Sequence, residues 1–247
     1  MQTDMTVGKP MKMLLNFTIP VFLGNVFQQL YSMADAVIVG KFVGTKGLAA
    51  VGATGTITFL IIGFLMGLTT GFTVLTSQKF GAGRMDEMRK TVGNAAILSV
   101  VIAVVMTAVS MLGMHRLLVF MHTPEDIFDG AYGYIMIICA GIFTQVLYNL
   151  VSSILRALGN SKTPLYFLIL AAVLNIVLDL VFIIFFHWGA PGAAWATVVS
   201  QGVSGLLCLI YIWKAVPELK MKREDWHCDK YIAGKQISAG LPRGLRV

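Results

Sequence analysis

Charged residues are scarce in this sequence. Asp, Glu, Lys and Arg make up 13% of its 247 residues and hydrophobic residues make up 57%, whereas soluble domains carry about 25% charged residues. So small a charged share cannot cover a water-facing surface, which excludes an ordinary soluble domain. The composition predicts an all-α integral membrane protein, because the apolar runs are long enough to cross a bilayer as helices.

Cysteine and histidine are also few, with three and four residues. Cys139 and Cys208 lie in apolar runs and Cys228 lies in a polar segment, without C-x-x-C spacing, and no two histidines are spaced as paired metal ligands. We find no nucleophile with a base or a metal ligand at a useful spacing. The sequence therefore argues against redox chemistry, an enzyme, a cofactor and a His or Cys metal site.

Six apolar runs are separated by short polar loops. Each is long enough to cross a bilayer, which takes about 20 residues. The runs are Met13–Val39, Val51–Gln78, Val92–Met114, Ile127–Leu155, Leu165–Phe186 and Gly192–Trp213. In the second run Gly63, Gly67 and Gly71 recur every four residues, a spacing that lets another helix approach closely. The sequence predicts a six-transmembrane-helix bundle.

The basic residues that give the chain its net charge of +7 lie mostly in the loops and tails between the apolar runs. If the spans alternate in direction, one side of the membrane carries 16 of the 19 Lys and Arg residues and the other carries Lys41, Lys46 and Arg116. The 16 are Lys9, Lys12, Lys79, Arg84, Arg89, Lys90, Arg156, Lys162 and the eight that follow Trp213. Cytoplasmic loops retain Lys and Arg, so we expect a cytoplasmic amino terminus and no nucleic-acid partner.

Two carboxylates lie well inside apolar runs, Asp35 in the first and Asp179 in the fifth. A charge at the centre of a bilayer costs roughly 2.5–3.5 kcal/mol on insertion scales, so such a residue normally faces the bundle interior or a wet cavity and has a function. At 1.5 Å per residue, Asp35 lies about 6 Å and Asp179 about 10 Å from the outer ends of their spans. The two carboxylates are therefore expected at one level, in the outer half of the membrane.

Three further polar side chains are expected in the same layer. Asn175 precedes Asp179 by one helical turn, Thr197 lies about 8 Å below the outer surface on the sixth span, and Tyr134 enters the outer part of the fourth. We expect these five groups to bind a proton or small cation. The competing use is a sodium ion held by Asp35, Asn175, Asp179 and Thr197 through their carboxylate, amide and hydroxyl oxygens. The residue types alone leave the choice of ion open.

Polar residues also follow one face of the first span. Asn25, Gln28, Ser32 and Asp35 are spaced by three, four and three residues, so we expect this face to look into the bundle and line a cavity. Alternatively, Asn25, Gln28 and Ser32 only hydrogen-bond neighbouring helices. Pro20, in the same span, is an expected bending point.

Four segments resemble motifs of the multidrug and toxic compound extrusion (MATE) transporters. They are Pro20 with Asp35, Ser77–Gly83, Arg156–Pro164 and Gly192–Thr197, which occur in order and at the expected spans. The resemblance covers essentially the whole chain. It implies an antiporter of the bacterial or archaeal inner membrane that exports cationic or amphipathic organic compounds against the entry of protons or sodium ions.

The resemblance also implies roles for individual residues. By position, Asp35, Asn175, Asp179, Thr197 and Tyr134 match the cation site of the family's amino-terminal lobe. Pro20 matches the proline at which the first helix of the family is proposed to bend.

The family has two six-helix lobes, and this chain resembles the first. We expect residues 1–213 to form that lobe, residues 214–234 a cytoplasmic linker, and residues 235–247 the truncated start of a seventh helix. A faint repeat, in which Gln236–Pro242 aligns with Leu14–Pro20, fits the way secondary transporters build two bundles. The expected partners are small organic substrates, the lipid bilayer and the missing carboxy-terminal lobe. The alternatives are a related lipid or polysaccharide flippase and a fragment that does not transport.

Overall fold

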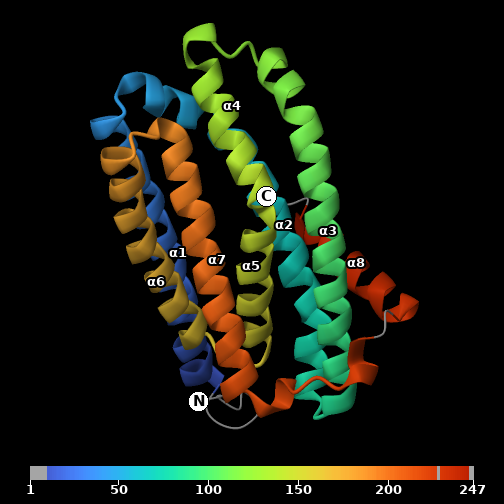
Figure 1. Ribbon diagram of the computed structural model, residues 1–247. Coiled ribbons are helices and arrows are strands. Elements are labelled where there is room, and N and C mark those ends of the chain that lie inside the picture. The colour runs from blue at the N-terminus through green and yellow to red at the C-terminus, as the bar shows by residue number, and fades with distance from the viewer. Residues whose placement is uncertain (1–9, 227–228, 245–247) are drawn as a thin grey trace.

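The computed structural model describes residues 10–226 and 229–244, and this part of the chain is almost entirely helical. The long helices run up and down as a bundle, with α5 continuing α4 in the same direction (Figure 1). They are α1 (Pro10–Phe42), α2 (Thr45–Gly81), α3 (Met85–Phe120), α4 (Glu125–Ala140), α5 (Ile142–Ala157), α6 (Lys162–Leu180) and α7 (Gly189–Ala215). A π-helical turn, η1 (Val181–Phe185), extends α6, and the 3₁₀ turns η2 (Pro217–Leu219) and η3 (Arg223–Trp226) connect α7 to the shorter α8 (Lys230–Gly244).

The six expected spans are present. Helices α1, α2, α3, α6 with η1, and α7 are each long and apolar enough to cross a membrane, and α4 with α5 forms a sixth span that is bent by 46°. The bend lies at Gly141, where the sequence predicted an uninterrupted run. A Cβ atom at Gly141 would lie 2.2 Å from Val198 Cγ2, so the missing side chain lets α7 pack into the elbow. The predicted all-α six-helix membrane bundle is confirmed, and its fourth helix is broken.

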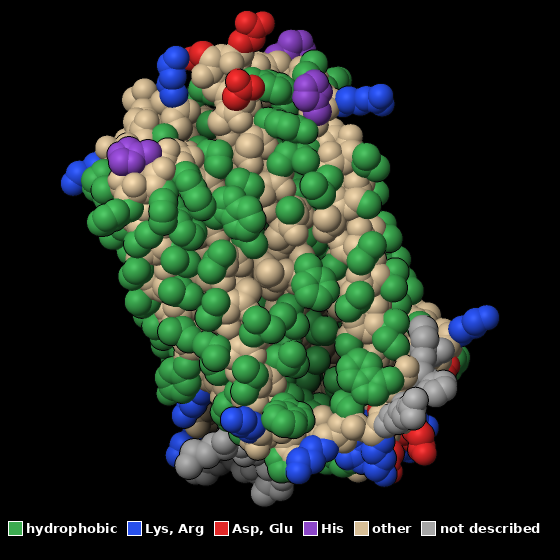
Figure 2. All heavy atoms as spheres, viewed as in Figure 1, with side chains coloured by type: hydrophobic (Ala, Val, Ile, Leu, Met, Phe, Trp, Pro, Cys, Tyr) green, Lys and Arg blue, Asp and Glu red, His purple; other side chains and the backbone are tan. Residues whose placement is uncertain are grey.

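Apolar side chains cover the flank of the bundle. Leu112 and Phe185 are each 83% exposed and Trp213 is also exposed. Figure 2 shows hydrophobic side chains over the height of one face, with charged side chains mostly towards its two ends. A soluble monomer rarely exposes so large an apolar surface. This flank suits contact with lipid, as expected of a multi-pass membrane protein.

Two buried apolar clusters hold the helices together. One contains Leu118, Ile135 and Ile138 among its fully buried members, and the other contains Phe72 and Leu155. Helix α7 contributes to both clusters. Helix α6 packs along α7, and α1 packs along α6 (Figure 1). Helices α1, α6 and α7 are therefore neighbours, which is the condition under which Asp35, Asp179 and Thr197 can meet.

Helix α8 lies against α2 through two pairs of glycines. A Cβ atom at Gly67 would lie 2.6 Å from Gly244 Cα, and one at Gly71 would lie 2.2 Å from Gly240 Cα. The close helix approach predicted from the glycine spacing is confirmed at these two positions. The fully buried Gln236 fixes the contact further, because its Nε2 donates to the carbonyl oxygens of Phe72, at 3.1 Å, and Thr91, at 2.8 Å.

The segment between α7 and α8 packs on α3. The buried Asp225 accepts a hydrogen bond from the Lys222 amide at 2.7 Å and lies 4.0 Å from the Arg89 guanidinium. Helix α8 begins at Lys230, five residues before the position at which a seventh helix was expected. Some predicted features lie outside the described residues. They are Lys9 and Arg246, which were used for the predicted topology, the two ends of the predicted domains at residues 1 and 247, and Cys228.

Candidate functional site

The two intramembrane aspartates meet between α1 and α6. Asp35 is 8% exposed and Asp179 is fully buried, and their carboxyl groups lie within hydrogen-bonding reach of one another. Two carboxyl groups can form a hydrogen bond only if one of them carries the proton. Two carboxyl groups placed in this way suit the binding of one shared proton or one shared small cation.

One oxygen of each carboxyl group has no hydrogen-bond donor outside the pair. Asp35 Oδ1 and Asp179 Oδ1 are buried and accept no hydrogen bond from an amide or hydroxyl group of the described residues. A buried polar atom without a partner carries a penalty of roughly 1–3 kcal/mol. These two oxygens are of the hard type that small cations such as sodium prefer. The two carboxyl oxygens are therefore chemically suited to hold either a proton or a sodium ion.

Asn175 connects Asp179 to α7. It lies one turn before Asp179 on α6, is fully buried, and has two possible amide orientations. In one, Nδ2 donates to Thr197 Oγ1 at 3.4 Å. In the other, Nδ2 donates to Asp179 Oδ2 at 3.0 Å while Oδ1 accepts from the Thr197 amide at 3.2 Å. We adopt the second, because both ends of the amide then face groups of opposite hydrogen-bonding character.

The Thr197 hydroxyl connects α7 to α1. It accepts a hydrogen bond of 3.1 Å from the Tyr31 hydroxyl. Tyr31 precedes Asp35 by four residues and so lies on the same helical face. Tyr31 is not among the predicted site residues, although its position one turn before an intramembrane aspartate is a signal that identifies it.

Local backbone structure supports this arrangement. The π turn η1 starts two residues after Asp179, and π turns inside helices frequently occur at functional sites. Helix α7 starts with small residues, and a Cβ atom at Gly192 would lie 3.2–3.5 Å from side-chain atoms of Trp188, Phe182 and Ile183. Because Gly192 has no side chain, the π turn can lie close to α7 and bring Asp179 towards Thr197.

Tyr134 lies in the same region without joining the hydrogen-bonded set. It is buried on α4, in the neighbourhood of Asp35, Asp179 and Tyr31. The structure thus brings together Asp35, Asn175, Asp179 and Thr197 as the spacing predicted, and places Tyr134 beside them. We refer to Tyr31, Asp35, Asn175, Asp179 and Thr197 as the carboxyl cluster.

The polar stripe on α1 is only partly directed inward. Asp35 is buried and Gln28 is half-buried, but Asn25 and Ser32 are exposed on the described bundle, and the Ser32 hydroxyl donates to the Gln28 carbonyl oxygen at 3.1 Å. The expectation that the whole stripe faces the bundle interior is wrong for Asn25 and Ser32. Spacing along one helix does not say which part of such a face a neighbouring helix covers, and here the Asp35 end is the buried part. A cavity-lining role for Asn25, Gln28 and Ser32 stays a prediction.

Helix α1 passes through Pro20 without interruption. Proline has no amide hydrogen, so the carbonyl oxygen one turn earlier lacks its usual helical donor. Bending at Pro20 stays a prediction.

Comparisons with known proteins agree with this fold. A family model described as MatE matches residues 20–181. The probable multidrug resistance protein YpnP of Bacillus subtilis is 33% identical over 246 residues, which cover 99% of this chain and 54% of that protein.

Solved structures give the same result. A multidrug resistance MATE family transporter in an outward-facing conformation superposes with a TM-score of 0.90 at 28% identity, covering 96% of this chain and 53% of the other. A MOP superfamily transporter from Pyrococcus furiosus, whose binding pocket is described as having reverse polarity, superposes with a TM-score of 0.88 at 29% identity, with coverages of 96% and 53%. The chain spans about half the length of the relatives that it matches. It belongs to the MatE family, the multidrug and toxic compound extrusion transporters.

Proposed function

We propose that this chain is the first six-helix lobe of a multidrug efflux transporter and that the carboxyl cluster is its coupling-cation site. The transporter exports small cationic or amphipathic organic compounds as protons or sodium ions enter. Its partner is a second six-helix lobe, as in relatives about twice as long. The protein is a transporter and not an enzyme, and it uses no cofactor besides the coupling ion.

The observation that carries this proposal is the contact between Asp35 and Asp179. Structural needs in a membrane helix are met more cheaply by amides and hydroxyls than by acids, so paired carboxylates at this depth call for a function. Each carboxyl group keeps a buried oxygen without a partner. The pair can therefore take up and release a cation without first breaking other bonds at these two oxygens.

The cluster also offers a route from cation binding to movement. It joins α1, α6 and α7 through Tyr31, Asp179 and Thr197, so a change in protonation alters the hydrogen bonds that hold α1 in place. The missing amide hydrogen of Pro20 makes α1 easier to bend on the amino-terminal side of Asp35. We propose that cation exchange at the cluster shifts α1 between two shapes, as alternating access requires.

We further propose that the protein lies in a bacterial or archaeal inner membrane with its amino terminus in the cytoplasm. Helix α1 begins at one end of the bundle, and α2, α5 and α7 finish at that same end. By the predicted topology, 16 of the 19 basic residues belong to this end. The positive-inside rule assigns that end to the cytoplasm.

Efflux of a fluorescent organic cation from inverted membrane vesicles tests the proposal. The vesicles contain the intact transporter, energised by a proton gradient alone or by a sodium gradient alone. We expect Asp35→Asn to abolish cation-driven transport, because asparagine cannot bind or release the coupling ion. The gradient that supports transport by the unaltered protein identifies that ion.

Asp129→Asn provides the matched control, since Asp129 is an exposed acidic residue in the first turns of α4. Membrane insertion and expression are measured for both variants. Undiminished transport by Asp35→Asn, at equal amounts of inserted protein, would refute the assignment of the coupling site.

A further inference from the structure

A second polar region lies at the opposite end of the bundle from the carboxyl cluster. A cavity of about 960 Å³ is lined by residues of α1, α2, α3, α5, α8 and η2, close to where α2 and α5 end. This volume is within the range of sites that hold small organic molecules, about 300–1,000 Å³. None of the carboxyl-cluster residues lines it.

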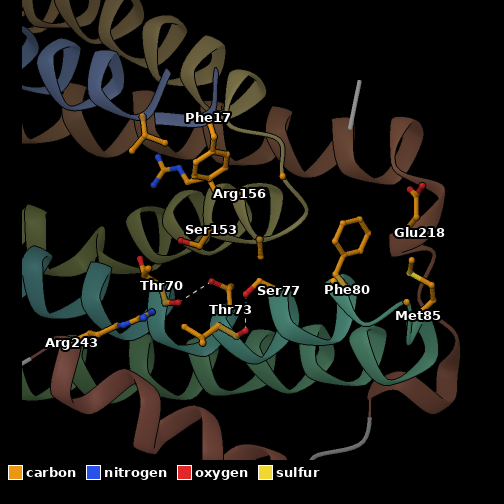
Figure 3. Close-up of a pocket in the computed structure, with 16 residues that line it drawn as sticks. Phe17, Thr70, Thr73, Ser77, Phe80, Met85, Ser153, Arg156, Glu218 and Arg243 are labelled. Carbon is orange, nitrogen blue, oxygen red and sulfur yellow. Dashed lines mark hydrogen bonds between the residues drawn. The ribbon is translucent and has the colours of Figure 1, made fainter. Parts of the chain in front are cut away.

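Two arginines line one end of this cavity. Arg156 is in the last turn of α5 and is half-buried, and Arg243 is in the last turn of α8. Figure 3 shows their side chains on either side of Ser153 and Thr70. No described carboxylate forms an ion pair with either guanidinium group. The dipole at a helix end favours a cation there, but by itself it satisfies none of the five N–H donors of a guanidinium.

Hydroxyl groups lie between the two arginines. Ser153 is buried, and its hydroxyl forms no hydrogen bond with a described residue; the same holds for Thr70. By contrast, Thr73 and Ser77 donate their hydroxyl hydrogens to carbonyl oxygens of their own helix, at 2.9 and 2.8 Å. The free donors of the cavity are thus gathered at the arginine end.

The remaining walls are mainly apolar. Phe17 and Val21 of α1 and Phe80 and Met85 line the cavity. Glu218 also lines it, but beside Phe80 and Met85, at the other end from both arginines (Figure 3). The cavity therefore combines a cationic, donor-rich end with an apolar body.

We propose that this cavity binds the phosphate group of an amphipathic organic phosphate. Guanidinium groups match phosphate oxygens with two parallel hydrogen bonds, and hydroxyl donors complete such a site. Two positive charges also balance a doubly charged phosphate monoester. The apolar part of the ligand lies along Phe17, Val21 and Phe80. The ligand is either a phospholipid headgroup with its chain or a water-soluble organic phosphate.

Binding assays on the purified 247-residue chain test this proposal without requiring transport. In one arm, hexyl phosphate is titrated calorimetrically into protein held in a neutral detergent. In the other, the protein is placed in phosphatidylcholine nanodiscs with or without phosphatidic acid, and retained lipid is counted by native mass spectrometry. Binding of hexyl phosphate alone identifies a soluble ligand, retention of phosphatidic acid alone identifies a lipid, and both together identify a site for either.

Arg156→Gln and Arg243→Gln should each weaken the binding that is found at least tenfold. Arg116→Gln, which alters an arginine near the end of α3 that does not line the cavity, should change it less than twofold. Arg243 is exposed, so its variant decides the matter if Arg156→Gln fails to fold. Absence of binding in both arms, or equal binding by Arg243→Gln and Arg116→Gln, would overturn the proposal.

Discussion

Replacing Gly71 with alanine should weaken the contact between α8 and α2. The new Cβ atom would lie 2.2 Å from Gly240 Cα and 2.9 Å from Ala239 O, whereas non-bonded carbon atoms prefer about 3.5–4.0 Å. Both neighbours are backbone atoms, so no change of side-chain rotamer relieves the overlap. Helix α8 has to move away by about 1 Å or more.

The size of the effect follows from two opposing terms. Overpacking typically costs 1–3 kcal/mol, and contact with rigid backbone places this case near the upper end, about 3 kcal/mol. Alanine offsets about 1 kcal/mol, because it is a better helix former than glycine. The net loss of about 2 kcal/mol makes detachment of α8 roughly 30-fold more frequent, since 1.4 kcal/mol corresponds to a factor of ten.

Amide hydrogen exchange measured by mass spectrometry detects this detachment. Exchange across residues 230–244 should become roughly 30-fold faster in Gly71→Ala, while α3 and α7 stay protected. Gly55→Ala is the matched control on the same helix, because a Cβ atom at Gly55 would meet no other atom within 4 Å. Exchange in α8 that is no faster in Gly71→Ala than in Gly55→Ala would refute the close packing of the two helices.

Three smaller perturbations have distinct expected results. Gln236→Leu removes two buried hydrogen bonds to backbone carbonyls, but it also removes an amide oxygen without a partner. We therefore expect the contact between α8 and α2 to lose about 1 kcal/mol of stability and exchange in α8 to become roughly fivefold faster. Unchanged exchange would contradict this. Tyr31→Phe removes the hydrogen bond to Thr197 and should lower the unfolding free energy by about 0.6–1.7 kcal/mol, measured by denaturant titration, with no change counting against the bond. Gly141→Ala should lower the thermal unfolding temperature, because its Cβ atom would overlap Val198 of α7. Gly113→Ala is the control and should not lower it, because a Cβ atom there meets nothing within 4 Å. Equal unfolding temperatures would show that the bend at Gly141 tolerates a side chain.

The spans and the carboxyl cluster could be predicted because both follow from one-dimensional quantities. The length of an apolar run decides whether a helix crosses the membrane, and residue spacing along a straight helix gives depth. These two rules placed Asp35, Asp179 and Thr197 at one level before any contact was known. They did not depend on how the helices pack around one another.

The features that were missed depend on packing in three dimensions. Depth along a helix does not say which neighbour a side chain faces, so Asn25 and Ser32 were expected to look inward but are exposed. The bend at Gly141 exists because Val198 of a distant helix occupies the space of the missing side chain. The docking of α8 depends in the same way on glycines almost 170 residues apart in the chain, as with Gly71 and Gly240. Tyr31 is hard to single out from the sequence, because tyrosine is common near membrane surfaces without any special role.

Infrared spectroscopy of the purified chain tests the central claim, that Asp35 and Asp179 share one proton or one sodium ion. In a sodium-free buffer at neutral pH, the unaltered protein should show a protonated-carboxyl band that disappears in both Asp35→Asn and Asp179→Asn and persists in Asp129→Asn. Sodium chloride should remove the band if sodium competes for the site and leave it unchanged if the site binds only protons. Absence of the band from the unaltered protein, or its persistence in both variants of the pair, would contradict the account.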